Sequence, residues 1–264
     1  MRPVLLPIVH GVAFKDNDKD YAGKFIKLIR SKLTDQERDY LIPIQFNYSN
    51  VTNQRQVEMF NAVDKGLDNE KLRLWKNIIG SDVTWSLIQA KGDAPSFFKS
   101  FNYDLATAIA NAKITYPGAA VVCIGHSQGS QLLYSFFFEY FGQIDGFVSM
   151  GSPIAMNSGA WYPSWGRVPE NLRFWDNYYH STDFISSRLK THPSESIRSF
   201  VNDFEVPKGW NLLYRLPDGL NLFGKWKVGW TKLVAGFMAH VGYWENDFVA
   251  TMVAKRVKHL IVAA

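Results

Sequence analysis

The chain has 264 residues, of which 47% are apolar, 20% are charged and 15% are aromatic. Its formal net charge is +5, from 29 basic and 24 acidic residues. This composition is that of an ordinary globular protein, and it excludes a disordered, collagen-like or coiled-coil chain. The positive charge is too small to indicate nucleic-acid binding, so we expect no nucleic-acid partner.

No internal repeat or low-complexity linker divides the sequence. We therefore expect a single domain over residues 1–264, with helical insertions near residues 50–95 and 207–239. The one cysteine, Cys123, excludes an intramolecular disulfide and suits a reducing compartment. There is no run of about 18 apolar residues that could span a membrane. The N-terminal segment MRPVLLPIVHG is too short and too interrupted for a signal peptide. These features predict a cytoplasmic protein, or one released by lysis or by a dedicated export route.

Short apolar runs alternate with amphipathic stretches in the first third of the chain. The run from Val4 to Val9 predicts a strand, and the helix predicted after it has its apolar residues on one face. That face holds Tyr21, Phe25, Leu28, Ile29 and Leu33. Residues 40–48 predict a second strand, which Pro43 places at an edge or a bend. Residues 53–79 have helical spacing.

The same alternation continues to the C-terminus. An apolar stripe with a spacing of four predicts a helix; it consists of Phe97, Phe101, Leu105 and Ile109. Residues 119–124 predict a central parallel strand buried on both faces. The remaining predicted elements are a helix over 129–141, strands over 146–150, 172–179 and 197–206, and a last helix over 245–260. Strands alternating with helices predict an α/β fold: a mostly parallel, doubly wound sheet with helices on both faces.

The clearest motif follows the predicted central strand. Residues 125–129 read GHSQG, the G-x-S-x-G pattern of a nucleophile elbow, in a strand–turn–helix context. In such a turn the serine backbone is strained, and a Cβ at Gly125 or Gly129 would clash with neighbouring backbone. The helix that begins there offers free N–H groups to a developing oxyanion. We therefore predict that Ser127 is a nucleophile; the alternative is an ordinary glycine-rich turn.

A serine nucleophile needs a base, and the base needs an orienting carboxylate. In proteins with this motif the chain order is Ser, then Asp or Glu, then His. His240 lies just before the last predicted helix, where the base is expected, and His180 is its rival. His192 lies in a polar loop, and His259 is expected at the surface of the last helix.

The acid is expected in a loop that follows a strand. Asp183 has this position after the strand predicted at 172–179. It is favoured over Asp176, which lies inside that strand, and over Asp203, which lies in or beside the next one. Asp183 also suits the N-cap of a helical segment at 184–189, and the two roles are compatible.

An oxyanion hole needs two donors. We assign the first to the backbone N–H of Gln128, the residue after the nucleophile. The second is expected from the early loop His10-Gly11-Val12, with the N–H of Val12 preferred and that of Gly11 as the alternative. Gly11 would let the backbone approach a substrate closely. His10 is expected beneath the hole as a structural residue, and it is also a candidate for substrate contact.

Five segments carry a wider similarity: Val9-His10-Gly11, residues 124–130, Gly151-Ser152-Pro153, residues 175–183 and residues 240–244. On these segments the sequence resembles the α/β-hydrolase superfamily, and within it bacterial and phage serine esterase and lipase-like proteins. The segments around Asp183 and His240 are more distantly similar to DDHD-type phospholipases. The resemblance implies an α/β-hydrolase fold and a Ser127–Asp183–His240 catalytic triad. It also implies ester hydrolysis through an acyl-enzyme, without a metal ion or an organic cofactor.

Other functions share the same residues. A thioesterase, an amidase or an acyltransferase would use the same triad, so these serine acyl-transfer enzymes are alternatives to an esterase. A non-catalytic binding protein with a hydrolase fold is a further alternative. The complete set of serine, aspartate, histidine and both glycines argues against it.

Aromatic residues are dense between the predicted acid and the predicted base. Over residues 207–239 they predict an aromatic-rich lid or an apolar wall for an acyl group, and the packed core of an extra helical layer is the alternative. The candidate substrate-contacting tryptophans are Trp161, Trp165, Trp210, Trp226 and Trp230. Basic residues interleave with them, which suits peripheral contact with an anionic lipid surface or an ordinary solvated helix face. The expected substrate is a small-molecule or lipid-like ester, and the oligomeric state stays open.

Overall fold

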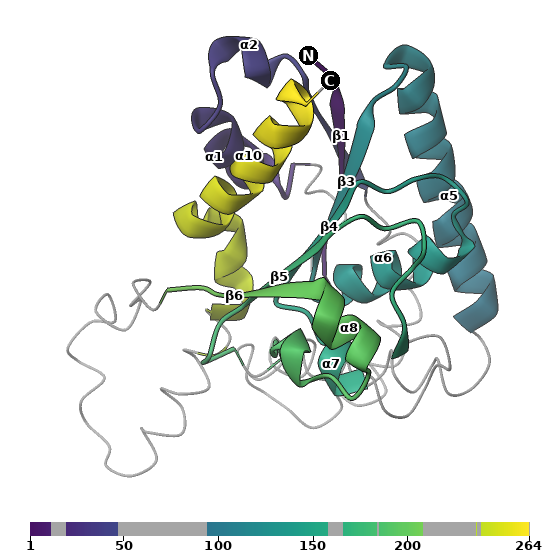
Figure 1. The fold of residues 1–264 in the computed structure, drawn as a ribbon, viewed down its shortest axis with the longest axis vertical. Coiled ribbons are helices and arrows are strands. Elements are labelled where there is room, and N and C mark those ends of the chain that lie inside the picture. Colours follow the sequence, from purple (N-terminus) through teal and green to yellow (C-terminus); the bar gives the residue numbers. More distant parts are fainter. Residues whose placement is uncertain are drawn as a thin grey trace, which may run out of the picture.

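A parallel β-sheet of six strands forms the centre of the protein (Figure 1). The computed structural model describes residues 1–11, 20–46, 94–157, 166–183, 185–207, 236 and 239–263. The strands are β1 (Val4–Val9), β2 (Leu41–Phe46), β3 (Ala120–His126), β4 (Gly146–Met150), β5 (Trp175–Tyr179) and β6 (Val201–Glu205). They lie in the order β2-β1-β3-β4-β5-β6, and every neighbouring pair is parallel. The predicted α/β class with a parallel sheet is confirmed.

Helices cover both faces of this sheet (Figure 1). The longer helices are α1 (Gly23–Ser31), α5 (Ala94–Thr115), α6 (Gln128–Glu139) and α10 (Asp247–Val262). The shorter ones are α2 (Asp35–Arg38), α7 (Ile154–Asn157) and α8 (Glu195–Phe200), with 3₁₀ turns η2 (Leu189–Thr191) and η5 (Gly242–Glu245). Helices α1 and α10 pack together on one face, and α5 and α6 pack together on the other.

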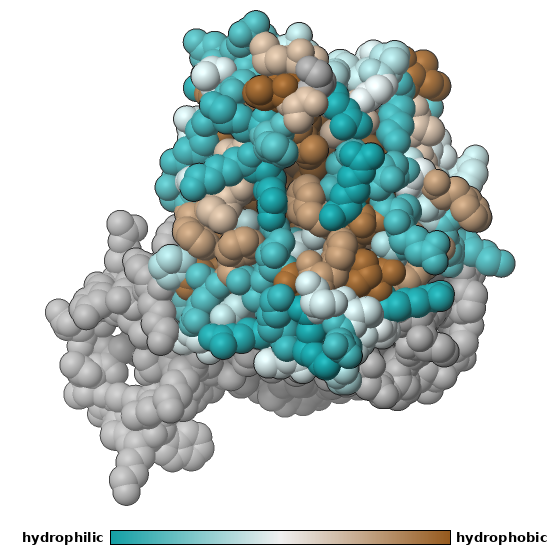
Figure 2. All heavy atoms as spheres, in the orientation of Figure 1, coloured by the Kyte–Doolittle hydropathy of each residue, from teal (hydrophilic) through white to brown (hydrophobic). Residues whose placement is uncertain are grey.

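The central strands are buried because both of their faces are covered. Every residue of β1, β3, β4 and β5 is buried, whereas most residues of β2 and β6 are not, since these two strands lie at the edges. Alternate residues of β3 serve different cores: Val121 and Cys123 pack in the layer of α5 and α6, and Val122 and Ile124 pack in the layer of α1 and α10. Figure 2 shows hydrophilic side chains over the outer surfaces of the helices and hydrophobic ones between the two layers.

Several predicted elements agree closely with the structure. The strands predicted at residues 4–9 and 146–150 have the predicted bounds. The strand that contains Pro43 is β2, which lies at a sheet edge as expected. The last predicted helix begins at Asp247 rather than at 245, because the Asn246 side chain caps it by accepting a hydrogen bond from the Val249 N–H at 3.1 Å.

Two predicted strands are too long. Residues 197–206 were predicted as one strand, but residues 195–200 form α8 and only Val201–Glu205 are extended. Ser194 precedes α8 with an extended backbone, and Ile197 turns its apolar side chain into the core from the helix. The strand predicted at 172–179 begins at Trp175, and Leu172 forms only an isolated bridge with Ile144.

The two predicted insertions lie mostly outside the described residues, so the helices predicted at 53–79 and the lid at 207–239 stay predictions. The single-domain organisation over residues 1–264 also stays a prediction. Within the described segments, no helix combines the length and the apolar character that crossing a membrane requires. The two ends of the chain meet, since the Arg2 N–H donates to the Ile261 carbonyl at 2.9 Å (Figure 1).

Candidate active site

The carboxyl ends of β1 and β3 lie side by side where the winding of the sheet reverses. The chain passes from β1 to β2 towards one edge, and from β3 to β4 towards the other edge. In doubly wound sheets, ligands bind in the crevice outside this reversal point. His10 and Gly11 directly follow β1, and Ser127 directly follows β3. The predicted nucleophile and the predicted oxyanion loop therefore share this position.

Ser127 forms a strained turn between β3 and α6. Its backbone has φ 51° and ψ −128°, and it is the only described residue other than glycine with a positive φ. The Ser127 N–H donates to the Met150 carbonyl at 2.9 Å, and its carbonyl accepts from the Ser130 N–H at 3.0 Å. Strain of this kind costs about 1–3 kcal/mol and persists only where the surrounding structure maintains it. Ser127 therefore forms a strained strand-to-helix turn.

Three glycines allow the close packing around this turn. A Cβ on Gly125 would lie 2.6 Å from Ser130 Cα, and a Cβ on Gly129 would meet the His10 carbonyl oxygen. Both obstacles are backbone atoms, so the predicted steric need for these two glycines is confirmed. A Cβ on Gly11 would lie 2.7 Å from Ser127 Cβ and 3.3 Å from Ser127 Oγ. Gly11 thus brings the loop after β1 against the serine.

Asp183 and His240 form a buried pair. His240 Nδ1 lies 3.0 Å from Asp183 Oδ2, and both side chains are at most 5% exposed. The other carboxylate oxygen, Oδ1, accepts the backbone N–H of Ile185 at 2.9 Å and that of Ser186 at 3.3 Å. One oxygen therefore accepts the N–H groups of the following turn, and the other lies against the histidine. The helix predicted at 184–189 is not found over residues 185–188, which are irregular, so Asp183 caps a turn and not a helix.

The electrostatics of Asp183 favour its charged form. Burial alone would raise the pKa of this carboxyl, but the nearby His240 and the hydrogen bonds from His240, Ile185 and Ser186 together lower it below its usual value. Asp183 is therefore an ionised acceptor at neutral pH, which is the state that orients a histidine through its Nδ1–H.

The other aspartates considered for this role have structural partners. Asp176 accepts two hydrogen bonds from Arg256, at 2.7 and 2.9 Å, and one from Asn202. Asp203 accepts from Asn177 and from the backbone of the η2 turn. Neither is hydrogen-bonded to a histidine in the described part of the chain.

The other histidines also have separate environments. The ring of His180 interacts with the N–H and hydroxyl of Thr182. His192 is buried, and its Nδ1 accepts from the Ser194 N–H at 3.0 Å. His259 is exposed on α10, as predicted. Among the sequence candidates, the structure brings Asp183 and His240 together.

His126 contacts His240 through a hydrogen bond and a ring contact, and the sequence did not predict this role. Its Nε2–H donates to the His240 carbonyl at 2.7 Å, and the two rings lie 4.9 Å apart between centroids. Burial, with the neighbouring His240, lowers the pKa of His126 to about 3. The ring is therefore neutral near pH 7. Its position inside G-x-S-x-G was visible in the sequence, but its partner lies 114 residues away.

Tyr243 and Ser186 were also missed. Tyr243 Oη lies 3.0 Å from Asp183 Oδ2 and 3.1 Å from Ser186 Oγ, and both residues are buried. The only sequence signal was the H-x-x-Y-W spacing after the predicted base. That spacing places Tyr243 in the η5 turn that follows His240.

No hydrogen bond joins Ser127 Oγ to the pair in this structure; Oγ is buried without a partner among the described groups. His240 nevertheless lies close to the serine turn. A Cβ on Gly151 would be 3.1 Å from His240 Nδ1, and Gly151 directly follows Met150, whose carbonyl accepts the Ser127 N–H. Catalytic contacts are often longer without substrate than in the reacting complex.

The predicted oxyanion and substrate residues are described only in part. Gln128 is the first residue of the 12-residue helix α6, where backbone N–H groups face the helix start. Gly11 lies against Ser127, but Val12 lies outside the described residues. His10 is buried; its Nδ1–H donates to the Gly11 carbonyl and its ring meets Tyr21 edge-on, which favours the structural role. Outside the described residues lie Trp161, Trp165, Trp210, Trp226 and Trp230.

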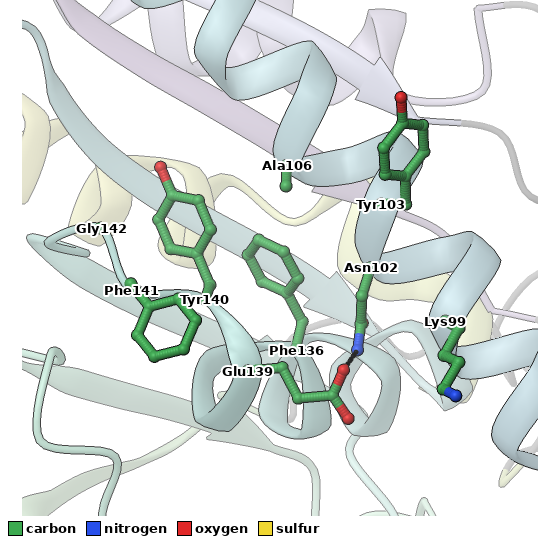
Figure 3. Close-up of a pocket in the computed structure, with 9 residues that line it drawn as sticks. All are labelled: Lys99, Asn102, Tyr103, Ala106, Phe136, Glu139, Tyr140, Phe141 and Gly142. Carbon is green, nitrogen blue, oxygen red and sulfur yellow. Dashed lines mark hydrogen bonds between the residues drawn. The ribbon is translucent and has the colours of Figure 1, made fainter.

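A separate hollow of about 400 Å³ lies between α5 and the C-terminal end of α6 (Figure 3). Asn102 on α5 donates to Glu139 on α6 across it at 2.6 Å. None of the predicted catalytic residues lines this hollow. In the described part of the chain, no group of three or more His, Cys, Asp or Glu side chains is arranged to hold a metal ion.

No protein-family model matches the sequence. No curated protein matches it either.

Proposed function

We propose that this protein is a serine hydrolase of the α/β-hydrolase type, which cleaves a carboxylic ester through Ser127, His240 and Asp183. The observation that carries the proposal is the strained Ser127 turn at the reversal point of the sheet, next to a buried Asp183–His240 pair. Strained backbone is expected where function requires it. The chain order Ser, Asp, His matches that of the α/β-hydrolase triad.

In the proposed first step, His240 Nε2 accepts the proton of Ser127 Oγ while Oγ bonds to the ester carbonyl carbon. No hydrogen bond in the described structure holds the Ser127 hydroxyl in another direction, so it is available to donate to His240 in the reacting complex. The Asp183 carboxylate stabilises the imidazolium that forms. The His240 proton then passes to the leaving alkoxide, and an acyl-enzyme remains.

The negative oxygen of the tetrahedral intermediate needs donors at the start of α6. The N–H of Gln128 is the proposed first donor, and the helix dipole adds to its effect. The loop after β1 supplies the second, because Gly11 is close enough to Ser127 that any side chain there would contact Oγ. Water activated by His240 then hydrolyses the acyl-enzyme and restores Ser127.

The proposal is tested with a fluorophosphonate probe and p-nitrophenyl esters of increasing chain length. The wild-type protein should be labelled and should hydrolyse at least the short esters. Ser127→Ala should lose labelling, and turnover should fall by about three orders of magnitude or more. Ser199→Ala is the matched control, since Ser199 is exposed on α8 and its hydroxyl donates only to the Ser196 carbonyl at 3.1 Å.

Equal labelling of the wild type and Ser127→Ala would overturn the proposal and favour a binding protein. Hydrolysis of thioesters or amides in preference to oxygen esters would assign the same triad to another acyl-transfer reaction. Preference for acetyl over octanoyl esters would contradict the predicted acyl-binding wall.

A further inference from the structure

Asp183 receives more hydrogen bonds than a catalytic acid needs to orient a histidine. His240 and Tyr243 donate to Oδ2, both at 3.0 Å, and the backbone N–H groups of Ile185 and Ser186 donate to Oδ1. The Tyr243 hydroxyl is the side-chain donor that the described structure places on Oδ2 together with the histidine. It shares a single carboxylate oxygen with His240 Nδ1, so the two donors compete for the same electron density.

The direction of each hydrogen bond around Tyr243 follows from chemistry. An ionised carboxylate can only accept, so the Tyr243 hydroxyl donates its single proton to Asp183. Burial and the Asp183 charge raise the pKa of Tyr243 well above its ordinary value, so the proton stays on the phenol. The contact at 3.1 Å must then run from the Ser186 hydroxyl to Tyr243 Oη.

The chain of donors extends one step further. The backbone N–H of His180 donates to Ser186 Oγ at 3.4 Å. The order is therefore His180 N–H, Ser186 hydroxyl, Tyr243 hydroxyl and Asp183 carboxylate, and every donor points towards the acid. Hydrogen bonds arranged in one direction polarise and strengthen each other, most of all at a buried site.

We propose that Tyr243 and Ser186 are positioning residues of the Asp183–His240 pair, which fix the carboxylate and limit how strongly it attracts the proton of His240. This inference rests on the proposed serine-hydrolase function for its catalytic meaning. The physical effect on the pair does not depend on that function, because it follows from the hydrogen bonds alone.

Two consequences follow for a variant without the Tyr243 hydroxyl. Asp183 loses a donor on the oxygen that faces His240, so the imidazolium becomes more stable and the histidine keeps its proton to higher pH. The carboxylate also loses a lateral restraint, so the histidine is held less firmly in its reactive orientation. The titratable groups that the structure describes against the pair are Tyr243 and His126, and His10 acts electrostatically on His126.

The test compares Tyr243→Phe with Tyr178→Phe in the full-length protein. Tyr178 is the matched control, because it is also buried in the sheet but its hydroxyl has no hydrogen-bond partner among the described groups. Two measurements are made: the NMR titration of the His240 ring, assigned with His240→Gln, and the pH profile of kcat and kcat/KM on a p-nitrophenyl ester.

In Tyr243→Phe, the His240 titration midpoint and the acidic limb of kcat/KM should both move to higher pH. The value of kcat should fall about tenfold with little change in KM. Tyr178→Phe should match the wild type in all of these. Ser186→Ala should give a smaller shift in the same direction, since its backbone N–H and the Tyr243 hydroxyl still reach the carboxylate. If Tyr243→Phe does not fold, the shift in Ser186→Ala is the measurement that tests the inference.

Equal His240 midpoints in the Tyr243, Ser186 and Tyr178 variants would overturn the inference, whatever the activities. A shifted midpoint in Tyr243→Phe, combined with a wild-type protein that cleaves no ester, would instead overturn the proposed function and leave the positioning role standing. A loss of kcat without a shift in either titration would reduce Tyr243 to a packing residue and also contradict the inference.

Discussion

At Ser127 the backbone takes a conformation that glycine tolerates and that residues with a Cβ rarely adopt. The turn is maintained by backbone hydrogen bonds on both sides, to Met150 and from Ser130. The side-chain oxygen is buried without a partner in the described structure. Neither the backbone angle nor the buried hydroxyl favours stability, which agrees with the catalytic role proposed for Ser127.

Two substitutions of Ser127 can separate the effect of its backbone strain from the effect of its hydroxyl. Ser127→Gly and Ser127→Ala both remove the hydroxyl, but only glycine relieves the backbone. We expect Ser127→Gly to be more stable than Ser127→Ala by about 1 kcal/mol, measured by urea unfolding. Both variants should lack esterase activity. Equal or reversed stabilities would show that the turn carries no strain.

His126 makes the stability of the fold depend on pH. Its pKa is lowered to about 3 in the folded protein, whereas the unfolded chain has the ordinary value of about 6.5. Between these values the unfolded chain binds more protons, so acid favours unfolding. We expect the free energy of unfolding to be level above about pH 7 and to fall by up to about 1.4 kcal/mol per pH unit below about pH 6.

The comparison is with His126→Gln, whose amide can still donate to the His240 carbonyl but does not titrate. Between about pH 7 and pH 5, urea unfolding should show the free energy of unfolding of the wild type falling relative to that of the variant as the pH falls. His192, whose pKa is also lowered by burial, is present in both proteins and therefore cancels. Parallel curves would contradict the assignment of a neutral, buried His126.

At the scale of elements, the sequence predicts best where one physical rule dominates. Strands covered on both faces must be apolar throughout, so β1, β3 and β4 were recognised from their runs of apolar residues. The segment at 197–206 was misread because a short helix and a short strand follow each other without a turn residue between them. Periodicity cannot separate elements as short as these.

The same argument applies to the site. The motif around Ser127 is contiguous, and a known template orders an acid and a base after it, so the sequence alone is enough to propose Ser127, Asp183 and His240. Their catalytic roles stay predictions. His126, Ser186 and Tyr243 act through contacts that span 57 to 114 residues of sequence. A local sequence pattern cannot predict contacts between residues so far apart in the chain. These three residues meet only because the fold places β3, β5 and the η5 turn next to each other.

Substitutions at the N-cap of α10 test whether a change in folding stability near the proposed site also changes activity. The Asn246 side chain caps the helix that follows the η5 turn. Replacing it with alanine should lower the free energy of unfolding by about 1 kcal/mol, because the Val249 N–H loses its partner. Asn246→Ser keeps an acceptor and should stay close to the wild type. Esterase kcat should be unchanged in both, and a large loss of kcat in the serine variant would contradict a purely capping role.

At the scale of the whole molecule, a hydrophobic core covers each face of the sheet, so only the edges and the strand ends are left open for a site. The layer of α1 and α10 and the layer of α5 and α6 close the faces, and β2 and β6 form the edges. The Ser127 turn follows the carboxyl end of β3, and Asp183 follows that of β5. The proposed site would therefore draw its residues from the ends of different strands and from the segment before α10, although each segment on its own is short.

The single cysteine lies in the middle of the strand that leads to this site. Cys123 is fully buried, its side chain faces the α5 and α6 layer, and burial raises the pKa of its thiol. A thiol reagent can reach it only when β3 separates from its neighbours, which requires the sheet to open. The rate of modification therefore measures how often the folded protein opens globally. Because no second cysteine contributes, a bound ligand that stabilises the fold can be detected by its protection of this one sulfur.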